Sequence, residues 1–179
     1  MTKQIIKLGS VLCAITFIVV LLLSLVNSMT ANIIYENNVK AENAARAELL
    51  EADSFNDMGD NVYVALKDGK SAGYCVKTET KGYGGKIVML VGFDVGLRLT
   101  GIKITESGET AGLGSKAAEP WFSQSLSGKE PLLTVKKNGG AGKSEIDAIS
   151  GATITTRAVT NAINESFKML KNKLEGVKK

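Results

Sequence analysis

The chain has 179 residues, of which 44% are apolar, and its 22 lysine and arginine side chains exceed its 18 acidic ones, giving a net charge of +4. This length suits one modest domain with an attachment. Histidine is absent, which excludes a His-ligated zinc site, a Ser-His-Asp triad and a histidine acid or base. No basic cluster adjoins an aromatic platform, so we expect no nucleic-acid partner.

The first long feature is an apolar run, Leu8–Val26, preceded by Lys3 and Lys7. It has about the 20 residues that a helix needs to cross a membrane. A cleaved signal peptide is the alternative, because the start is basic, although its apolar core would be unusually long. We predict a retained transmembrane helix over 8–28. The positive-inside rule keeps residues 1–7 in the cytoplasm and puts the residues after the helix on the outer side of the membrane.

Residues 29–52 are rich in Ala and Glu with apolar positions at helical spacing, which predicts a juxtamembrane stalk helix. The remaining residues, 53–179, are expected to form the extracytoplasmic domain. Cys75 is the only cysteine there, since Cys13 lies in the apolar run, so no disulfide forms within the domain.

The domain opens with short β-branched runs separated by Gly-containing turns, which are hairpin signals. We therefore predict an antiparallel meander, with a bulge near Gly101. A short helix through Trp121 and Phe122, a strand near Leu132 to Val135 and an amphipathic helix from about Ile154 to Leu174 follow. The fold class is α+β. The predicted strands of the meander are Val62–Lys67, Gly73–Thr80, Ile87–Phe93 and Leu97–Thr105.

The most informative stretch runs from Asp147 to Thr156, and it is typical of a strand end, a tight turn and a helix start. Gly151 and Ala152 carry little side-chain bulk, and a helix start offers free N–H groups and a positive dipole end. Such a turn suits a phosphate. In the alternative interpretation, Ser150 or a threonine only caps the helix.

Residues 147–153, Asp-Ala-Ile-Ser-Gly-Ala-Thr, resemble the flavinylation motif of the FMN-binding domain family. This family includes the G subunit of the Rnf complex and the C subunit of the sodium-pumping NADH:quinone oxidoreductase. The resemblance implies that Thr153 carries FMN through a phosphoester bond made by a flavin transferase that uses FAD. Asp147 would serve transferase recognition or turn geometry, and no metal site is expected.

A second segment, Glu109–Gly114, is similar to the family's Glu-Thr-Pro-Gly-Leu-Gly, with Ala111 in place of proline. We expect this loop to lie along the isoalloxazine ring; a plain surface turn is the alternative. Trp121 and Phe122 are expected in the core, with stacking on the flavin as the alternative. Tyr83 is expected to contact the cofactor or another subunit, or to anchor its loop. The expected cofactor-binding residues are Glu109, Thr110, Gly112, Leu113, Gly114, Ser150, Gly151, Ala152 and Thr155.

The resemblance implies a membrane-anchored electron-transfer subunit of an Rnf-type complex, which couples ferredoxin:NAD electron transfer to translocation of Na⁺ or H⁺. Such a redox subunit does not catalyse alone. Its partners would be other membrane and peripheral subunits, the transferase and the lipid bilayer. The alternatives are a C-type subunit of the quinone reductase, a stand-alone membrane-anchored extracytoplasmic flavoprotein, and a non-redox adhesion or scaffold domain.

Overall fold

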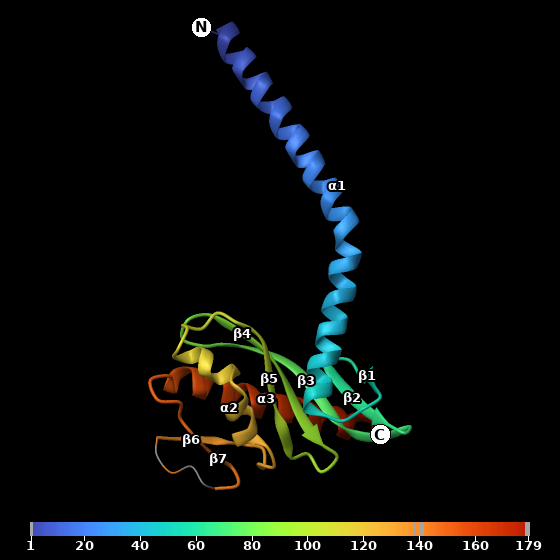
Figure 1. Cartoon of the computed structure of the whole chain (residues 1–179), viewed down its shortest axis with the longest axis vertical. Coiled ribbons are helices and arrows are strands. Elements are labelled where there is room, and N and C mark those ends of the chain that lie inside the picture. The colour runs from blue at the N-terminus through green and yellow to red at the C-terminus, as the bar shows by residue number, and fades with distance from the viewer. Residues whose placement is uncertain (1, 138, 140–141, 178–179) are drawn as a thin grey trace. The chain divides into compact units, whose positions relative to one another are not determined.

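The computed structural model describes residues 2–137, 139 and 142–177 (Figure 1). The chain divides into two compact units, Met1–Ala41 and Glu42–Lys179. The described residues of the first unit are helical and belong to α1 (Thr2–Leu49), whose last residues form part of the second unit.

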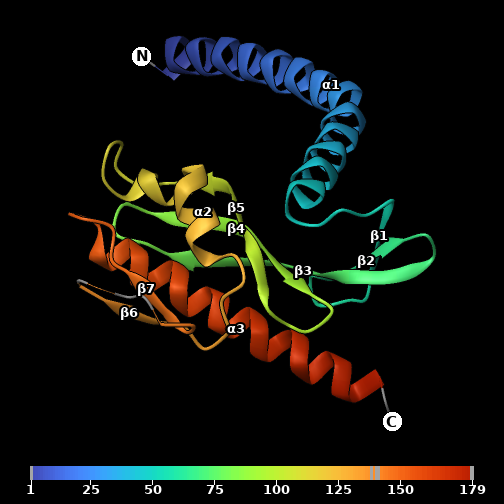
Figure 2. The same cartoon turned by 60° about the horizontal axis from the view of Figure 1, so that its bottom comes forward.

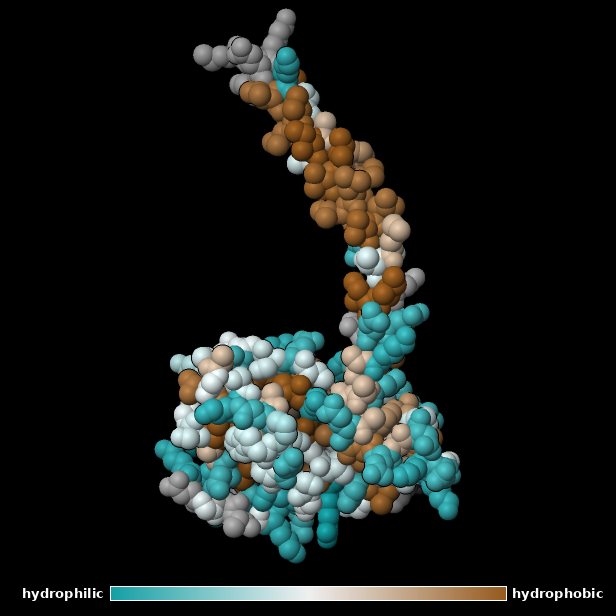
Figure 3. All heavy atoms as spheres, viewed as in Figure 1, coloured by the Kyte–Doolittle hydropathy of each residue, from teal (hydrophilic) through white to brown (hydrophobic). Residues whose placement is uncertain are grey.

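Within the first unit, Ile6–Ala31 is long and apolar enough to cross a membrane, with a mean hydropathy of 2.7. None of this stretch is buried inside the protein, and Figure 3 shows its surface as mostly hydrophobic. A helix that is apolar on all sides is stable when lipid surrounds it. An N-terminal signal sequence meets the same criteria of length and composition. The predicted boundaries at residues 7, 28 and 52 stay predictions.

The second unit contains a five-stranded sheet in the order β1-β2-β3-β4-β5, with each neighbouring pair antiparallel, so the predicted meander is confirmed. Alternating β-branched residues and tight turns produce it. Asp68 and Gly69 both have positive φ, as the type I′ turn of a two-residue hairpin requires. The strands are β1 (Ser54–Asp57), β2 (Val62–Lys67), β3 (Lys70–Lys81), β4 (Lys86–Asp94) and β5 (Leu99–Ser107).

Two details of the sheet bear on the predictions from sequence. The bulge is confirmed, because Gly92 pairs with Gly101 and Phe93 pairs with Leu99, so that Thr100 is an extra residue. The first strand, β1, was not predicted. Its Asn and Asp residues are typical of loops, but an edge strand with exposed side chains tolerates them.

One face of the sheet is covered by α3 (Thr153–Val177), which runs along it in Figure 2. The short helices η1 (Gly114–Ala118) and α2 (Pro120–Leu126) lie on the chain between β5 and the small parallel pair β6 (Thr134–Lys136) and β7 (Glu145–Asp147). Asn164 on α3 holds the chain before β6, since its side chain bonds to both the N–H and the C=O of Leu133 at 2.8 and 2.9 Å. The largest fully buried side chains of this core include Phe93, Phe122, Ile87, Met89, Leu126, Ile163 and Leu170.

The end of α1 covers part of the other face. Leu50, directly after the helix, packs with Ala65, Cys75 and Leu90 in a second apolar cluster. Close approach depends on glycine, because a Cβ on Gly73 would lie 2.8 Å from Leu50 Cδ2. The residues from Glu42 onward are thus part of the folded domain by packing.

Candidate functional site

The turn before α3 has the predicted form. β7 ends at Asp147, and Ala152 N–H donates to Ile149 O at 2.9 Å to close the turn. Gly151 has a φ of +78°, which a residue with a side chain rarely adopts. The helix then begins at Thr153, whose side chain is half-buried.

Thr156 holds this turn in place through two hydrogen bonds of its side chain. It is fully buried, and its hydroxyl accepts from Ile149 N–H at 3.0 Å and donates to Ala152 O at 2.9 Å. Across the described residues, no backbone carbonyl accepts from the N–H groups of Thr153, Ile154 or Thr155. The turn is thus rigid and presents three unpaired N–H groups at the positive end of a long helix, which favours an anion.

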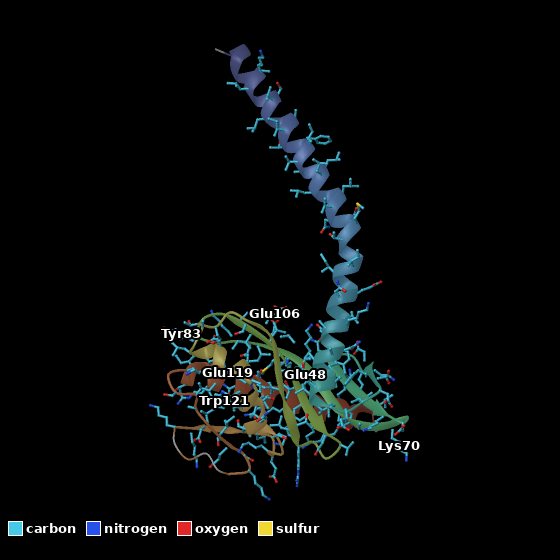
Figure 4. All side chains as sticks on the ribbon, in the orientation of Figure 1. Glu48, Lys70, Tyr83, Glu106, Glu119 and Trp121 are labelled. Carbon is cyan, nitrogen blue, oxygen red and sulfur yellow. The ribbon has the colours of Figure 1, made fainter. Side chains whose placement is uncertain are left out.

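A pocket of about 320 Å³ opens at this helix start. Three segments far apart in sequence form it: the turn between β3 and β4, the loop after β5, and the first turn of α3. Figure 4 shows Tyr83 at the outer end of the β3–β4 hairpin. The pocket is lined by Tyr83, Glu109, Thr110, Leu113, Gly114, Gly151, Ala152, Thr153, Ile154 and Thr155.

The rim of this pocket is apolar and open to solvent. The side chains of Tyr83, Leu113 and Ile154 are 73%, 46% and 57% exposed, although large apolar side chains are usually buried. Leu113 also contacts the turn, since its Cδ2 lies 3.1 Å from the position of a Cβ on Gly151. An open apolar rim beside a helix start fits a planar aromatic ligand that carries a phosphate.

The structure brings together most of the predicted cofactor-binding residues. Gly112 and Ser150 are not among the residues lining the pocket. Gly112 N–H instead donates to Ser115 Oγ at 2.9 Å, which shapes the loop. Ile154 was missed, although an apolar residue at an exposed position of a helix start was a usable signal.

Asp147 and Trp121 lie away from this pocket. Both line a separate hollow of about 200 Å³. The prediction of a core position is confirmed for Phe122, which is 1% exposed, and is wrong for Trp121, which is 47% exposed. The indole N–H of Trp121 donates to Glu119 Oε2 at 2.7 Å, and this polar tip keeps its ring at the surface.

The described residues hold no group of three or more His, Cys, Asp or Glu that could bind a metal. The pocket does fit FMN: its volume lies at the lower end of the range for small-molecule sites, its walls suit an aromatic ring, and its floor offers N–H donors to a phosphate.

Comparison with known proteins agrees with this geometry. Residues 82–168 match the FMN-binding domain family, and this range contains every residue that lines the pocket. The G subunit of the Na⁺-translocating ferredoxin:NAD⁺ oxidoreductase complex of Acetobacterium woodii is 37% identical, over 95% of this chain and 93% of its own length. The chain belongs to the family of G subunits of ion-translocating oxidoreductase complexes.

Another G subunit, from the proton-translocating ferredoxin:NAD⁺ oxidoreductase complex of Clostridium ljungdahlii, is 33% identical over 86% of this chain and 85% of its own. Among solved structures, the C subunit of the Na⁺-translocating NADH-quinone reductase of Parabacteroides distasonis is similar. It has a TM-score of 0.52 and 30% identity, covering 59% of this chain and 57% of that one. This chain and that quinone-reductase subunit thus have a similar fold over the part that the comparison covers.

Proposed function

We propose that this chain carries FMN covalently, as a phosphoester of Thr153, and relays electrons within its complex. One observation carries the proposal: the half-buried Thr153 begins α3 at the wall of an apolar pocket, with unpaired N–H groups beside it. A phosphate ester on its Oγ would lie next to those donors and the positive helix end.

The attachment is a phosphoryl-type transfer with no change of oxidation state. Thr153 Oγ forms a new P–O bond to the FMN phosphorus of FAD, the pyrophosphate bond of FAD breaks, and AMP leaves while the hydroxyl proton passes to a base. A threonine hydroxyl is a weak nucleophile, so a transferase has to activate it. Asp147 is exposed and lies outside the pocket, which supports a role in recognition by that transferase or in the turn.

Once FMN is bound, it supplies the one- and two-electron chemistry, and the residues of this chain position and shield it. The N–H groups of Thr153, Ile154 and Thr155 would bind the phosphate, while Leu113 and Tyr83 would exclude water from the ring. Thr110 and Gly114 also line the pocket, and the Thr110 hydroxyl and the Gly114 N–H would contact the polar edge of the ring.

The assignment of this chain to a particular complex rests on its relatives. We infer that the chain works in an Rnf-type complex that moves electrons between ferredoxin and NAD and transports Na⁺ or H⁺, since its relatives are named for both ions. The apolar helix Ile6–Ala31 supports a membrane anchor. The basic N-terminus supports a cytoplasmic start and an extracytoplasmic domain. The partners would be the other subunits of the complex and, during maturation, the transferase.

The attachment is tested by producing the full chain together with a flavin transferase and looking for in-gel fluorescence after denaturation. Thr153→Val keeps the shape of the side chain and removes the hydroxyl, so we expect complete loss of bound flavin. Thr134→Val, on an exposed strand outside the pocket, is the matched control and should label like the parent. Flavin on Thr153→Val would disprove the site, and no flavin on the parent would disprove the function.

A further inference from the structure

Both carboxylate oxygens of Glu109 are engaged by the protein itself. Oε1 accepts from Gly84 N–H at 2.9 Å, in the turn between β3 and β4. Oε2 accepts from the hydroxyl of Thr155 at 2.6 Å, in the first turn of α3. A single side chain therefore joins the three segments that form the pocket.

Glycines surround this carboxylate and leave the space that it occupies. A Cβ on Gly82 would collide with Oε1 of Glu109, and a Cβ on Gly114 would collide with Oε2. The backbones of the two loops also touch, because a Cβ on Gly84 would lie 2.7 Å from Gly108 O. Gly82 and Gly84, on either side of Tyr83, therefore serve two purposes: they form the turn, and they allow the close packing around Glu109.

Thr155 depends on this contact. Its side chain is 1% exposed, so solvent cannot supply a hydrogen-bond partner for its hydroxyl, and burying a hydroxyl without any partner is costly. Glu109 is the acceptor, and a bond to an ionised carboxylate is among the stronger hydrogen bonds. Since Thr155 lies two residues after Thr153, the bond fixes the helix turn that carries the proposed attachment residue.

We propose that Glu109 is a positioning residue that holds the Tyr83 turn and the first turn of α3 together, and that it does not bind the flavin. Its effect on the flavin rests on the proposed function of the pocket. The connection between Gly84, Glu109 and Thr155 stands independently and can be measured in the protein without flavin.

Three substitutions separate positioning from charge. Glu109→Gln removes the charge but keeps an oxygen for Gly84 N–H and presents an amide N–H to Thr155 Oγ, which can accept it. Glu109→Asp keeps the charge but is one methylene too short to reach both partners. Glu109→Ala removes both contacts. Positioning predicts that Gln resembles the parent and that Asp resembles Ala.

The first measurement is amide hydrogen exchange at Gly84 in the full chain without flavin, in detergent. We expect exchange about tenfold faster in Glu109→Ala and Glu109→Asp, from the loss of one hydrogen bond, and little change in Glu109→Gln. Unchanged exchange in Glu109→Ala would overturn the connection, whether or not the protein takes flavin. Thr155→Val is the control here, because it keeps the bond between Glu109 and Gly84 and should leave exchange at Gly84 near the parent rate. If the Glu109 variants do not fold, the attachment rate of Thr155→Val carries the test.

The second measurement is the initial rate of flavin attachment with purified transferase. We expect the rate to fall about tenfold in Glu109→Ala and in Thr155→Val. The double variant should show no further loss, because both substitutions remove the same bond between Thr155 and Glu109. A parental rate in Glu109→Ala, or equal loss in Glu109→Gln and Glu109→Ala, would overturn the positioning role. Failure of the parent to take flavin would instead contradict the proposed function, while the exchange measurement still decides the connection.

Discussion

Three threonines in the first turn of α3 have different surroundings although they are close neighbours in sequence. Thr153 is half-buried at the pocket wall, Thr155 is buried and donates to Glu109, and Thr156 is buried and holds the turn. From sequence, Thr153 was predicted as the attachment residue and Thr155 as a cofactor contact. The partner of Thr155 could not be predicted, because Glu109 is 46 residues away and no local pattern joins the two.

Among these residues we expect Thr156→Val to destabilise the domain by about 1–3 kcal/mol, because it leaves Ile149 N–H buried without an acceptor. Urea unfolding, followed by circular dichroism, measures the change. Thr160→Val is the matched control. Its hydroxyl donates only within α3, to Thr156 O at 2.8 Å, so its loss should cost less. Equal losses in the two variants would contradict the role given to Thr156.

Among the elements, the domain is a sheet with α3 on one face and the end of α1 on the other. Alternation and turn residues were enough to predict the meander and its bulge. They could not predict β1, whose polar residues are typical of loops. The packing of Glu42–Leu50 on the sheet was also not foreseen, since a helix followed by a breaker gives no sign of what it contacts.

Cys75 on β3 reports on this packing. Burial raises the pKa of the Cys75 thiol to about 12, well above its value of about 8.5 in an unfolded chain. The folded protein therefore keeps the thiol protonated at pH 8. Because the folded pKa is raised, this contribution to stability is complete below about pH 8.5 and is lost as the pH rises towards 12.

We expect Cys75 to resist alkylation by iodoacetamide at pH 8, since the thiolate is the reactive form. The measurement uses the full chain with Cys13→Ser, so that Cys75 is the only thiol. Leu50→Ala should increase the rate, because it loosens the packing above the thiol. Rapid alkylation of the folded parent would contradict this packing; addition of urea should make the thiol react in both proteins.

For the molecule as a whole, the proposed function needs a membrane anchor with the flavin domain outside. Labelling with a membrane-impermeant maleimide tests this in intact cells, in the Cys13→Ser background. We expect Ser127→Cys, an exposed position after α2, to be labelled, and Thr2→Cys to be labelled only after the cells are permeabilised. The reverse pattern would contradict the proposed orientation.

The proposed function depends above all on a single hydroxyl that carries the flavin, and peptide mass spectrometry decides whether it does. Trypsin cleaves after Lys143 and Arg157, so the proposed attachment residue lies in peptide 144–157 with several other hydroxyl groups. Fragmentation of this peptide from flavinylated protein distinguishes them. We predict the mass of FMN less one water on Thr153; the same mass on Ser150, Thr155 or Thr156, or an unmodified peptide, would contradict the proposal.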